Sequence, residues 1–157
     1  KKLNNEIIGD INIKSGKLRK PIRSSKDFYE KTTDEFPILF CIAALTKGQS
    51  VFRGIGDLAN KESNRIKEMQ KILKQIGVRS IANRDEMKIF GHDFISNRNK
   101  KINVPKLGDH RICMSTTILS LVTGIKAKIS NFETVKTSSP NFLKKIKFLG
   151  AKFEIQS

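Results

Sequence analysis

The chain has 157 residues, the length of a single domain. Its 31 lysines and arginines against 15 aspartates and glutamates give a net charge of +16. Apolar residues make up 38% of the chain, enough for a packed core, which excludes wholesale disorder. No apolar run is long enough to cross a bilayer, and the first residues lack the apolar stretch of a signal peptide. We therefore expect a soluble, cytoplasmic protein with no membrane partner.

The positive charge is spread along the chain and forms no run of five or six residues. A surplus of this size is typical of nucleic-acid binders, because neutralising phosphates releases counterions. Base stacking also needs aromatic residues near the cations, yet the chain has one tyrosine and no tryptophan. We expect no nucleic-acid partner, and a basic nucleic-acid-binding module remains the alternative function.

The two cysteines, Cys41 and Cys113, lie far apart inside apolar segments. Neither stands beside a second cysteine or a histidine at the spacing of a metal site. We expect reduced thiols in the core, no metal site and no cofactor.

The first half of the chain alternates predicted strands and helices. Apolar residues between 11 and 22 predict short strands around a turn. Residues 34–48 predict a helix with Pro37 in its first turn and Gly48 closing it in a left-handed conformation. A strand is expected at 51–52, followed by an amphipathic helix over 61–75 that ends at Gly77. Residues 78–82 and 87–90 predict a β-hairpin.

The second half repeats this order. Asp109 is expected to open a helix that ends at Gly124. A strand at 127–129, a helix from Pro140 and a final strand at 153–155 follow. Strand, helix, strand, helix, strand therefore occurs twice, which favours two copies of one unit. The predicted fold class is α/β (α+β), with one unit over about 9–95 and a partial one over about 102–157.

Charged residues gather at the predicted helix starts. Asp34 can cap its helix or accept a proton from a substrate hydroxyl. Lys61 and Arg65 would share a helix face as like charges, which is unfavourable unless an anion binds between them. Glu62 beside them can serve proton transfer or stabilise the helix dipole.

Two further groups of polar and charged residues also lie at predicted helix starts. Residues 108–111 (GDHR) can form an anion site from free amides and Arg111, or a simple cap at Asp109. Residues 136–140 (KTSSP) can cap a helix or contact a phosphate. Together these helix starts indicate one site for a small, multiply anionic ligand.

Four motifs in this order resemble one enzyme family. Residues 34–39 (DEFPIL), 61–65 (KESNR), 108–114 (GDHRICM) and 136–140 (KTSSP) are similar to the C-terminal portion of 5-enolpyruvylshikimate-3-phosphate synthases. The resemblance covers about 9–155. It implies a two-domain monomer in which each domain, an inverse α/β barrel, has three βαβαββ units. Substrates would lie between the domains, so this chain would be an incomplete C-terminal domain whose N-terminal domain is missing.

The activity implied by the resemblance is transfer of the enolpyruvyl group from phosphoenolpyruvate to the 5-hydroxyl of shikimate 3-phosphate, in the shikimate pathway of aromatic amino-acid biosynthesis. Asp34 would be the base at that hydroxyl. Lys61 would contact this substrate and the transition state, and Glu62 would transfer a proton at the methylene carbon of phosphoenolpyruvate. Asp57 would be a further contact for shikimate 3-phosphate.

The resemblance also implies which residues hold phosphoenolpyruvate. Its phosphate and carboxylate would be bound by Arg65, Arg111 and Lys136, with His110 nearby. Ala59 and Ser139 depart from the family, which usually has an arginine and an aromatic residue there. A catalytically inactive descendant is a further alternative, against which the presence of Asp34 and Glu62 argues. Because the other wall of the cleft is absent, we expect no measurable turnover from this chain alone.

Overall fold

The computed structural model describes residues 2–3, 6–10, 12–14, 16, 20–93 and 99–155. Within these residues the strands are β1 (Lys2–Leu3), β2 (Glu6–Ile7), β3 (Arg23–Ser24), β4 (Gly48–Arg53), β5 (Arg79–Ala82), β6 (Glu86–Gly91), β7 (Lys101–Val104) and β8 (Lys126–Ile129). The helices are α1 (Lys26–Thr32), α2 (Phe36–Ala44), α3 (Arg65–Gln75), α4 (His110–Thr123) and α5 (Phe142–Phe148). Short 3-10 helices are η1 (Thr33–Glu35), η2 (Gly56–Asn60) and η3 (Phe132–Thr137).

The strands form a larger and two smaller sheets. The larger one has the order β3-β4-β6-β5, in which β3 and β4 are parallel and the remaining neighbours antiparallel. The strands β7 and β8 pair in parallel, and β1 pairs with β2. Parallel neighbours need a crossover, and the segments that contain α2 and α4 provide it in the two halves.

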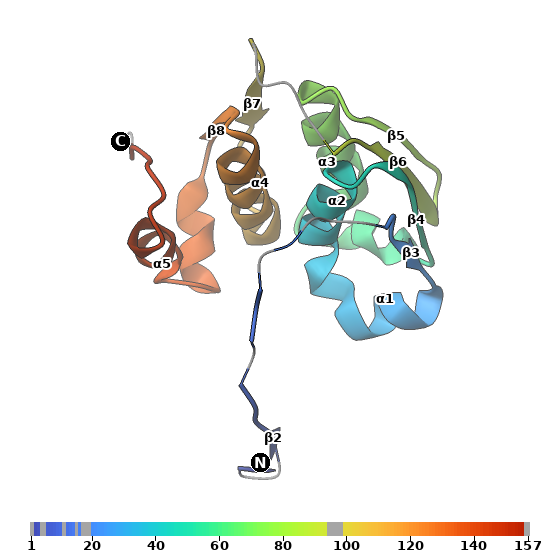
Figure 1. Ribbon diagram of the computed structural model, residues 1–157, viewed down its shortest axis with the longest axis horizontal. Coiled ribbons are helices and arrows are strands. Elements are labelled where there is room, and N and C mark those ends of the chain that lie inside the picture. The colour runs from blue at the N-terminus through green and yellow to red at the C-terminus, as the bar shows by residue number, and fades with distance from the viewer. Residues whose placement is uncertain are drawn as a thin grey trace.

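Helices cover one face of the larger sheet. Figure 1 shows α2 and α3 between this sheet and α4, and residues of α4 contact both helices. The core lies in these layers and includes Phe36, Phe40 and Phe52, which meet edge to face. No helix in the described part of the chain is long and apolar enough to cross a membrane.

The α/β class is confirmed, and the repeated alternation is found in the second half only as far as its second helix, because the final strand expected at 153–155 is absent from the described residues. Residues 23–91 run β3, the helices α1 and α2, β4, α3, β5 and β6, and residues 101–148 run β7, α4, β8 and α5, with one α-helix where the first half has two. The hairpin appears as β5 and β6, and the strands at 51–52 and 127–129 lie in β4 and β8. Gly77 and Gly124 follow α3 and α4 with φ of 78° and 69°, a left-handed conformation that glycine adopts without strain. The cysteines are free and buried, as expected.

Several boundaries differ from the prediction. The helix expected up to residue 47 ends at Ala44, so Gly48 begins a strand instead of closing the helix. The helix expected from residue 61 starts at Arg65, and the last one starts at Phe142 rather than Pro140. The strand expected at 153–155 is absent, because this segment has no partner strand among the described residues.

The prediction for residues 11–22 is only partly covered by the structure. Residues 12–14, 16 and 20–22 are not in strands, and the short strand β3 follows at Arg23–Ser24. Positions 11, 15 and 17–19 lie outside the described residues.

Candidate active site

The helices α2, α3 and α4 begin close together, and the predicted site residues gather there. Asp34 lies in η1 just before α2, Arg65 is the first residue of α3, and Arg111 lies in the first turn of α4. Side-chain hydrogen bonds join all three, although Asp34 and Arg111 are separated by 77 positions in sequence. The fold therefore builds one cluster from both halves of the chain.

Arg65 is the centre of this cluster. Its side chain is only 1% exposed and donates from Nε to Asp109, from Nη1 to Asp34 and from Nη2 to Glu62. Burial by itself lowers the pKa of the guanidinium, but the hydrogen bond to Asp109 and the surrounding carboxylates outweigh it, and the pKa is raised. Arg65 is therefore a permanent buried cation.

Arg111 forms the second cationic group. Its Nη1 lies 2.9 Å from Oε1 of Glu35, and its Nη2 lies 3.3 Å from Oδ2 of Asp34. The Nε atom of Arg111 is buried and has no hydrogen-bond partner among the described residues. A buried donor without a partner is uncommon in folded proteins.

Asp34 is a bridge between the two arginines and makes no side-chain hydrogen bond that caps η1 or α2. Of the two interpretations that the sequence left open for Asp34, helix capping is therefore wrong. Partial burial works against ionisation of this carboxyl, but the Arg65 hydrogen bond and the charge of Arg111 outweigh it, so the pKa is lowered. Asp34 is thus ionised at neutral pH.

Lys61 and Asp57 form a second pair beside the cluster. Lys61 lies before α3, so it does not share a helix face with Arg65, and the predicted like-charge repulsion along that face is absent. Its Nζ instead lies 2.9 Å from Oδ2 of Asp57, which also accepts a hydrogen bond from the hydroxyl of Tyr29 at 3.1 Å. The hydrogen bond with Asp57 raises the pKa of Lys61 and, with that from Tyr29, lowers the pKa of Asp57.

His110 borders the cluster, whereas the structure gives Lys136 no side-chain contact with the described cluster residues. His110 places Nδ1 4.0 Å from Oε1 of Glu62. Lys136 lies in η3, which is tied to the loop before α4 by a hydrogen bond from Thr134 to the carbonyl oxygen of Gly108. The exposed Lys136 side chain contacts no acidic group in the described part of the chain.

Three members of the cluster were not among the predicted site residues: Glu35, Ser63 and Asp109. Glu35 pairs with Arg111, and Ser63 donates a hydrogen bond to Asp109. The motifs did contain all three, but local spacing gave Asp109 only a capping role. Their roles depend on contacts over 44 to 76 positions, which no local pattern reveals.

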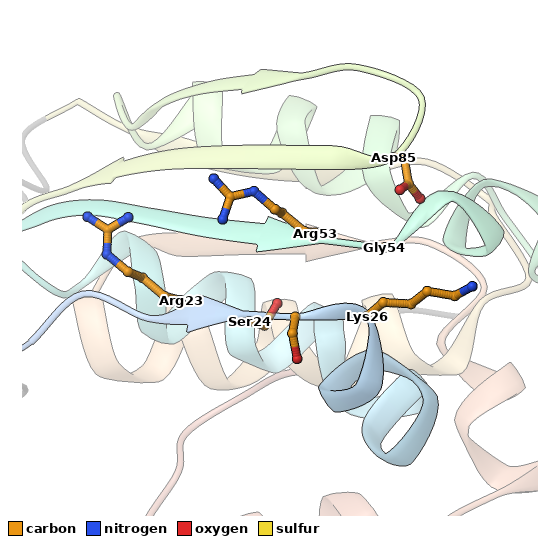
Figure 2. Close-up of a pocket in the computed structure, with 7 residues that line it drawn as sticks. Arg23, Ser24, Lys26, Arg53, Gly54 and Asp85 are labelled. Carbon is orange, nitrogen blue, oxygen red and sulfur yellow. The ribbon is translucent and has the colours of Figure 1, made fainter.

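Two hollows of the surface lie away from this cluster. One, of about 490 Å³, lies on the larger sheet between β3 and β4 and is lined by Arg23, Ser24, Ser25, Lys26, Arg53, Gly54 and Asp85. Figure 2 shows Arg23 on β3 and Arg53 on the neighbouring strand β4. A second hollow, lined by Lys67, Gln70, Lys71, Lys74, Val78, Arg79 and Ser80, lies between α3 and β5. Neither of these two hollows contains a predicted site residue.

Comparisons with known proteins agree with the motifs. The family model "EPSP synthase (3-phosphoshikimate 1-carboxyvinyltransferase)" matches residues 10–146. The 3-phosphoshikimate 1-carboxyvinyltransferase of Clostridium tetani is 34% identical over 89% of this chain and 31% of its own length. That of Zymomonas mobilis is 34% identical over 96% of this chain and 33% of its own length.

A solved structure shows the same arrangement of the chain. The EPSP synthase of Acinetobacter baumannii superposes with a TM-score of 0.74 at 31% identity, over 88% of this chain and 32% of that one. The chain thus spans about a third of the length of the relatives it matches. From the four motifs, their convergence in the fold and these matches, it follows that this chain belongs to the EPSP synthase (3-phosphoshikimate 1-carboxyvinyltransferase) family.

Proposed function

We propose that this chain forms one wall of a site where the enolpyruvyl group of phosphoenolpyruvate is transferred to the 5-hydroxyl of shikimate 3-phosphate. One observation carries the proposal: Arg65 hydrogen-bonds to both Asp34 and Glu62. Two carboxylates suited to proton transfer therefore flank a buried cation suited to an anionic reactant. Addition to the enol ether and elimination of phosphate need this combination.

Asp34 is the proposed base at the 5-hydroxyl. Its lowered pKa keeps it ionised, as a proton acceptor must be, but also makes it a weak base while both arginines face it. An anion bound to Arg65 and Arg111 would neutralise these charges and raise the basicity of Asp34. Binding of phosphoenolpyruvate would in this way activate the base.

Glu62 is the proposed group for proton transfer at the methylene carbon. It contacts Arg65 and lies beside His110, so a phosphoenolpyruvate bound to Arg65 comes within its reach. Lys61 would contact shikimate 3-phosphate and stabilise negative charge in the transition state, since its raised pKa keeps it protonated. Asp57 holds Lys61 in the unliganded chain and is the further candidate contact for that substrate.

Arg65, Arg111 and Lys136 are the proposed ligands for the phosphate and carboxylate of phosphoenolpyruvate, with His110 nearby. The carboxylates of Asp34 and Glu35 occupy donors of Arg111 in the structure. An incoming anion would replace them, and Nε of Arg111 supplies a donor that no described residue uses. Paired guanidinium donors bind carboxylate and phosphate with well-defined geometry.

The proposed complete enzyme has a second domain, and this chain would be an incomplete C-terminal domain with units over about 9–95 and 102–157. The missing N-terminal domain would hold shikimate 3-phosphate from the other side of the cleft, in a monomer without cofactor. Effective catalysis depends on holding both substrates in one geometry. The chain alone is therefore expected to show no turnover.

A chimera tests the proposed function. This chain would replace the segment of the Acinetobacter baumannii enzyme that it matches, and phosphate release from phosphoenolpyruvate with shikimate 3-phosphate would be measured. We expect turnover in the chimera, and a loss of about 100- to 10,000-fold with Asp34→Asn or Glu62→Gln. The matched control, Glu30→Gln, changes an exposed carboxylate outside the cluster and should retain the rate. A folded chimera without activity, or one that tolerates both site substitutions, would refute the proposal.

A second candidate function is binding of a nucleic acid, favoured by the hollow between α3 and β5. Its lining contains Lys67, Lys71, Lys74 and Arg79 and no carboxylate. Lysines four or three positions apart on one helix repel each other; Glu68 pairs with Lys71 at 2.7 Å, and a phosphate backbone would relieve the remaining repulsion. Affinity for an oligonucleotide that falls steeply with salt and is lost in Lys71→Glu would support this candidate. Selectivity for shikimate 3-phosphate over inorganic phosphate would support the enzyme.

A further inference from the structure

Asp109 is a fully buried carboxylate shared by the starts of two helices. Its Oδ1 accepts the backbone N–H groups of Arg111 and Ile112 at 3.0 and 3.2 Å, the bonds of an N-cap. Its Oδ2 accepts Nε of Arg65 at 3.0 Å and the hydroxyl of Ser63 at 2.9 Å. One oxygen therefore serves α4, and the other serves the start of α3.

Capping alone does not account for the negative charge of Asp109. Asparagine and serine cap helices about as well as aspartate. A charged carboxylate with no exposure is costly unless a cation pairs with it, and Arg65 is that cation. The ion pair with Arg65 therefore accounts for the negative charge of Asp109, and the N-cap of α4 accounts for the position of its Oδ1 atom.

The carboxylates around Arg65 differ in how easily a ligand could replace them. The side chains of Asp34 and Glu62 are 55% and 45% exposed, so an anion can reach the Nη1 and Nη2 atoms that they occupy. Asp109 has no exposed surface and holds Nε from behind. Arg65 therefore donates to one carboxylate that a ligand cannot reach, that of Asp109. Its other two partners, Asp34 and Glu62, are carboxylates that a ligand can replace.

We propose that Asp109 is the positioning residue of this site. It holds Nε of Arg65 so that Nη1 and Nη2 face the anion, and through the cap of α4 it fixes the turn that carries Arg111. Ser63 restrains the same carboxylate oxygen. The identity of the anion, phosphoenolpyruvate, rests on the proposed function, whereas the positioning of Arg65 does not.

Two substitutions separate this role from capping. Asp109→Asn and Asp109→Ser both retain a capping side chain and remove the charge. Asp85→Asn is the matched control, since Asp85 also accepts a backbone N–H, that of Gly56, at a place outside the cluster. Arg65→Lys removes the guanidinium and serves to assign its signal.

The first readout needs no ligand and follows the Nε–H resonance of Arg65 in an ¹H–¹⁵N spectrum. A guanidinium N–H that donates to a buried carboxylate exchanges slowly with water. We expect the signal in the unsubstituted chain and in Asp85→Asn, and its loss or displacement in both Asp109 variants. The second readout is titration with phosphoenolpyruvate, where the Asp109 variants should bind about 10- to 100-fold more weakly, the value of a hydrogen bond to a charged group.

The outcomes are distinct. Folded Asp109 variants that keep the Arg65 signal and bind phosphoenolpyruvate like Asp85→Asn would reduce Asp109 to a cap and overturn the proposal. A changed signal with no binding by any chain, the unsubstituted one included, supports the positioning role and counts against the proposed function. If both Asp109 variants fail to fold, Ser63→Ala carries the test: a displaced Arg65 signal supports the proposal, and an unchanged one overturns it.

Discussion

The two halves of the molecule bury their apolar residues to different extents. Residues 23–91 contain a four-stranded sheet, and Phe36 and Phe40 of α2 and Phe52 of β4 have no exposed surface. Residues 101–148 contain a two-stranded sheet, and at their end Phe148 and the following Leu149 are 89% and 81% exposed. The first half therefore encloses its core, whereas the second presents apolar surface at α5.

The candidate site lies where these unequal halves meet. Arg65 comes from the first, and Asp109 and Arg111 come from the second. The charged cluster is therefore a structural link as well as a chemical site. Substitutions in the first core should change stability most, those in the cluster should change stability and ligand binding, and those at α5 should change neither.

The largest expected effect contrasts the two halves. Phe52→Ala should lower the free energy of unfolding by about 3–5 kcal/mol, because it leaves a cavity among buried rings. Phe148→Ala should change it by less than about 0.5 kcal/mol. Urea unfolding of both variants measures the contrast. Similar losses would show that the second half buries Phe148 in solution.

The link between the halves is tested by Arg65→Ala. This substitution leaves the buried charge of Asp109 without its cation and should cost about 3 kcal/mol in urea unfolding. Arg53→Ala is the control: Arg53 is largely exposed in its pair with Glu86, and its loss should cost less than about 1 kcal/mol. Equal effects of the two substitutions would contradict a structural role for the cluster.

Close packing in the first half is tested at Gly91, the last residue of β6. A Cβ atom there would overlap the carbonyl oxygens of Ala43 and Thr46, which belong to the backbone around the end of α2. Gly91→Ala should therefore cost about 2 kcal/mol, seen as a lower urea midpoint. Gly16→Ala adds the same methyl group in open space and should leave the midpoint unchanged.

Acidification should gradually lower the free energy of unfolding, because it protonates carboxylates in and beside the cluster. The pKa values of Asp34 and Asp57 are lowered in the folded chain, so each contributes stability above its unfolded pKa that is lost as the pH falls through its folded pKa. We expect the free energy of unfolding to be level between neutral pH and about pH 5 and to fall below about pH 4. Asp34→Asn should show a smaller acid loss. An acid profile identical to that of the unsubstituted chain would contradict the pairing of Asp34 with Arg65.

The smallest expected effect concerns the reactivity of the two cysteine thiols. Burial raises the pKa of the Cys41 thiol to about 12 and that of Cys113 to about 11, so neither forms much thiolate at pH 8. A disulfide reagent should label neither cysteine in the folded chain and both in urea. Rapid labelling of Cys113 without denaturant would show that α4 opens more readily than the core of the first half.

Local sequence signals were sufficient to predict those helix boundaries that depend on one or two residues. Asp109 caps α4, and Gly77 and Gly124 end α3 and α4 as expected. The signals were insufficient where an end depends on contacts elsewhere: the segment at 153–155 alternates like a strand but has no partner strand among the described residues. The motifs identified most of the cluster, but the contact between Arg65 and Asp34 spans 31 positions and comes only from the fold.

An amide-shift titration of the labelled chain tests the central claim most directly. Shikimate 3-phosphate and phosphoenolpyruvate would be added together, with inorganic phosphate as the control. The account predicts larger shifts than phosphate causes, focused at the starts of α2, α3 and α4 near Asp34, Arg65 and Arg111. Shifts no larger than those with phosphate, or shifts centred on the hollow between α3 and β5, would contradict it.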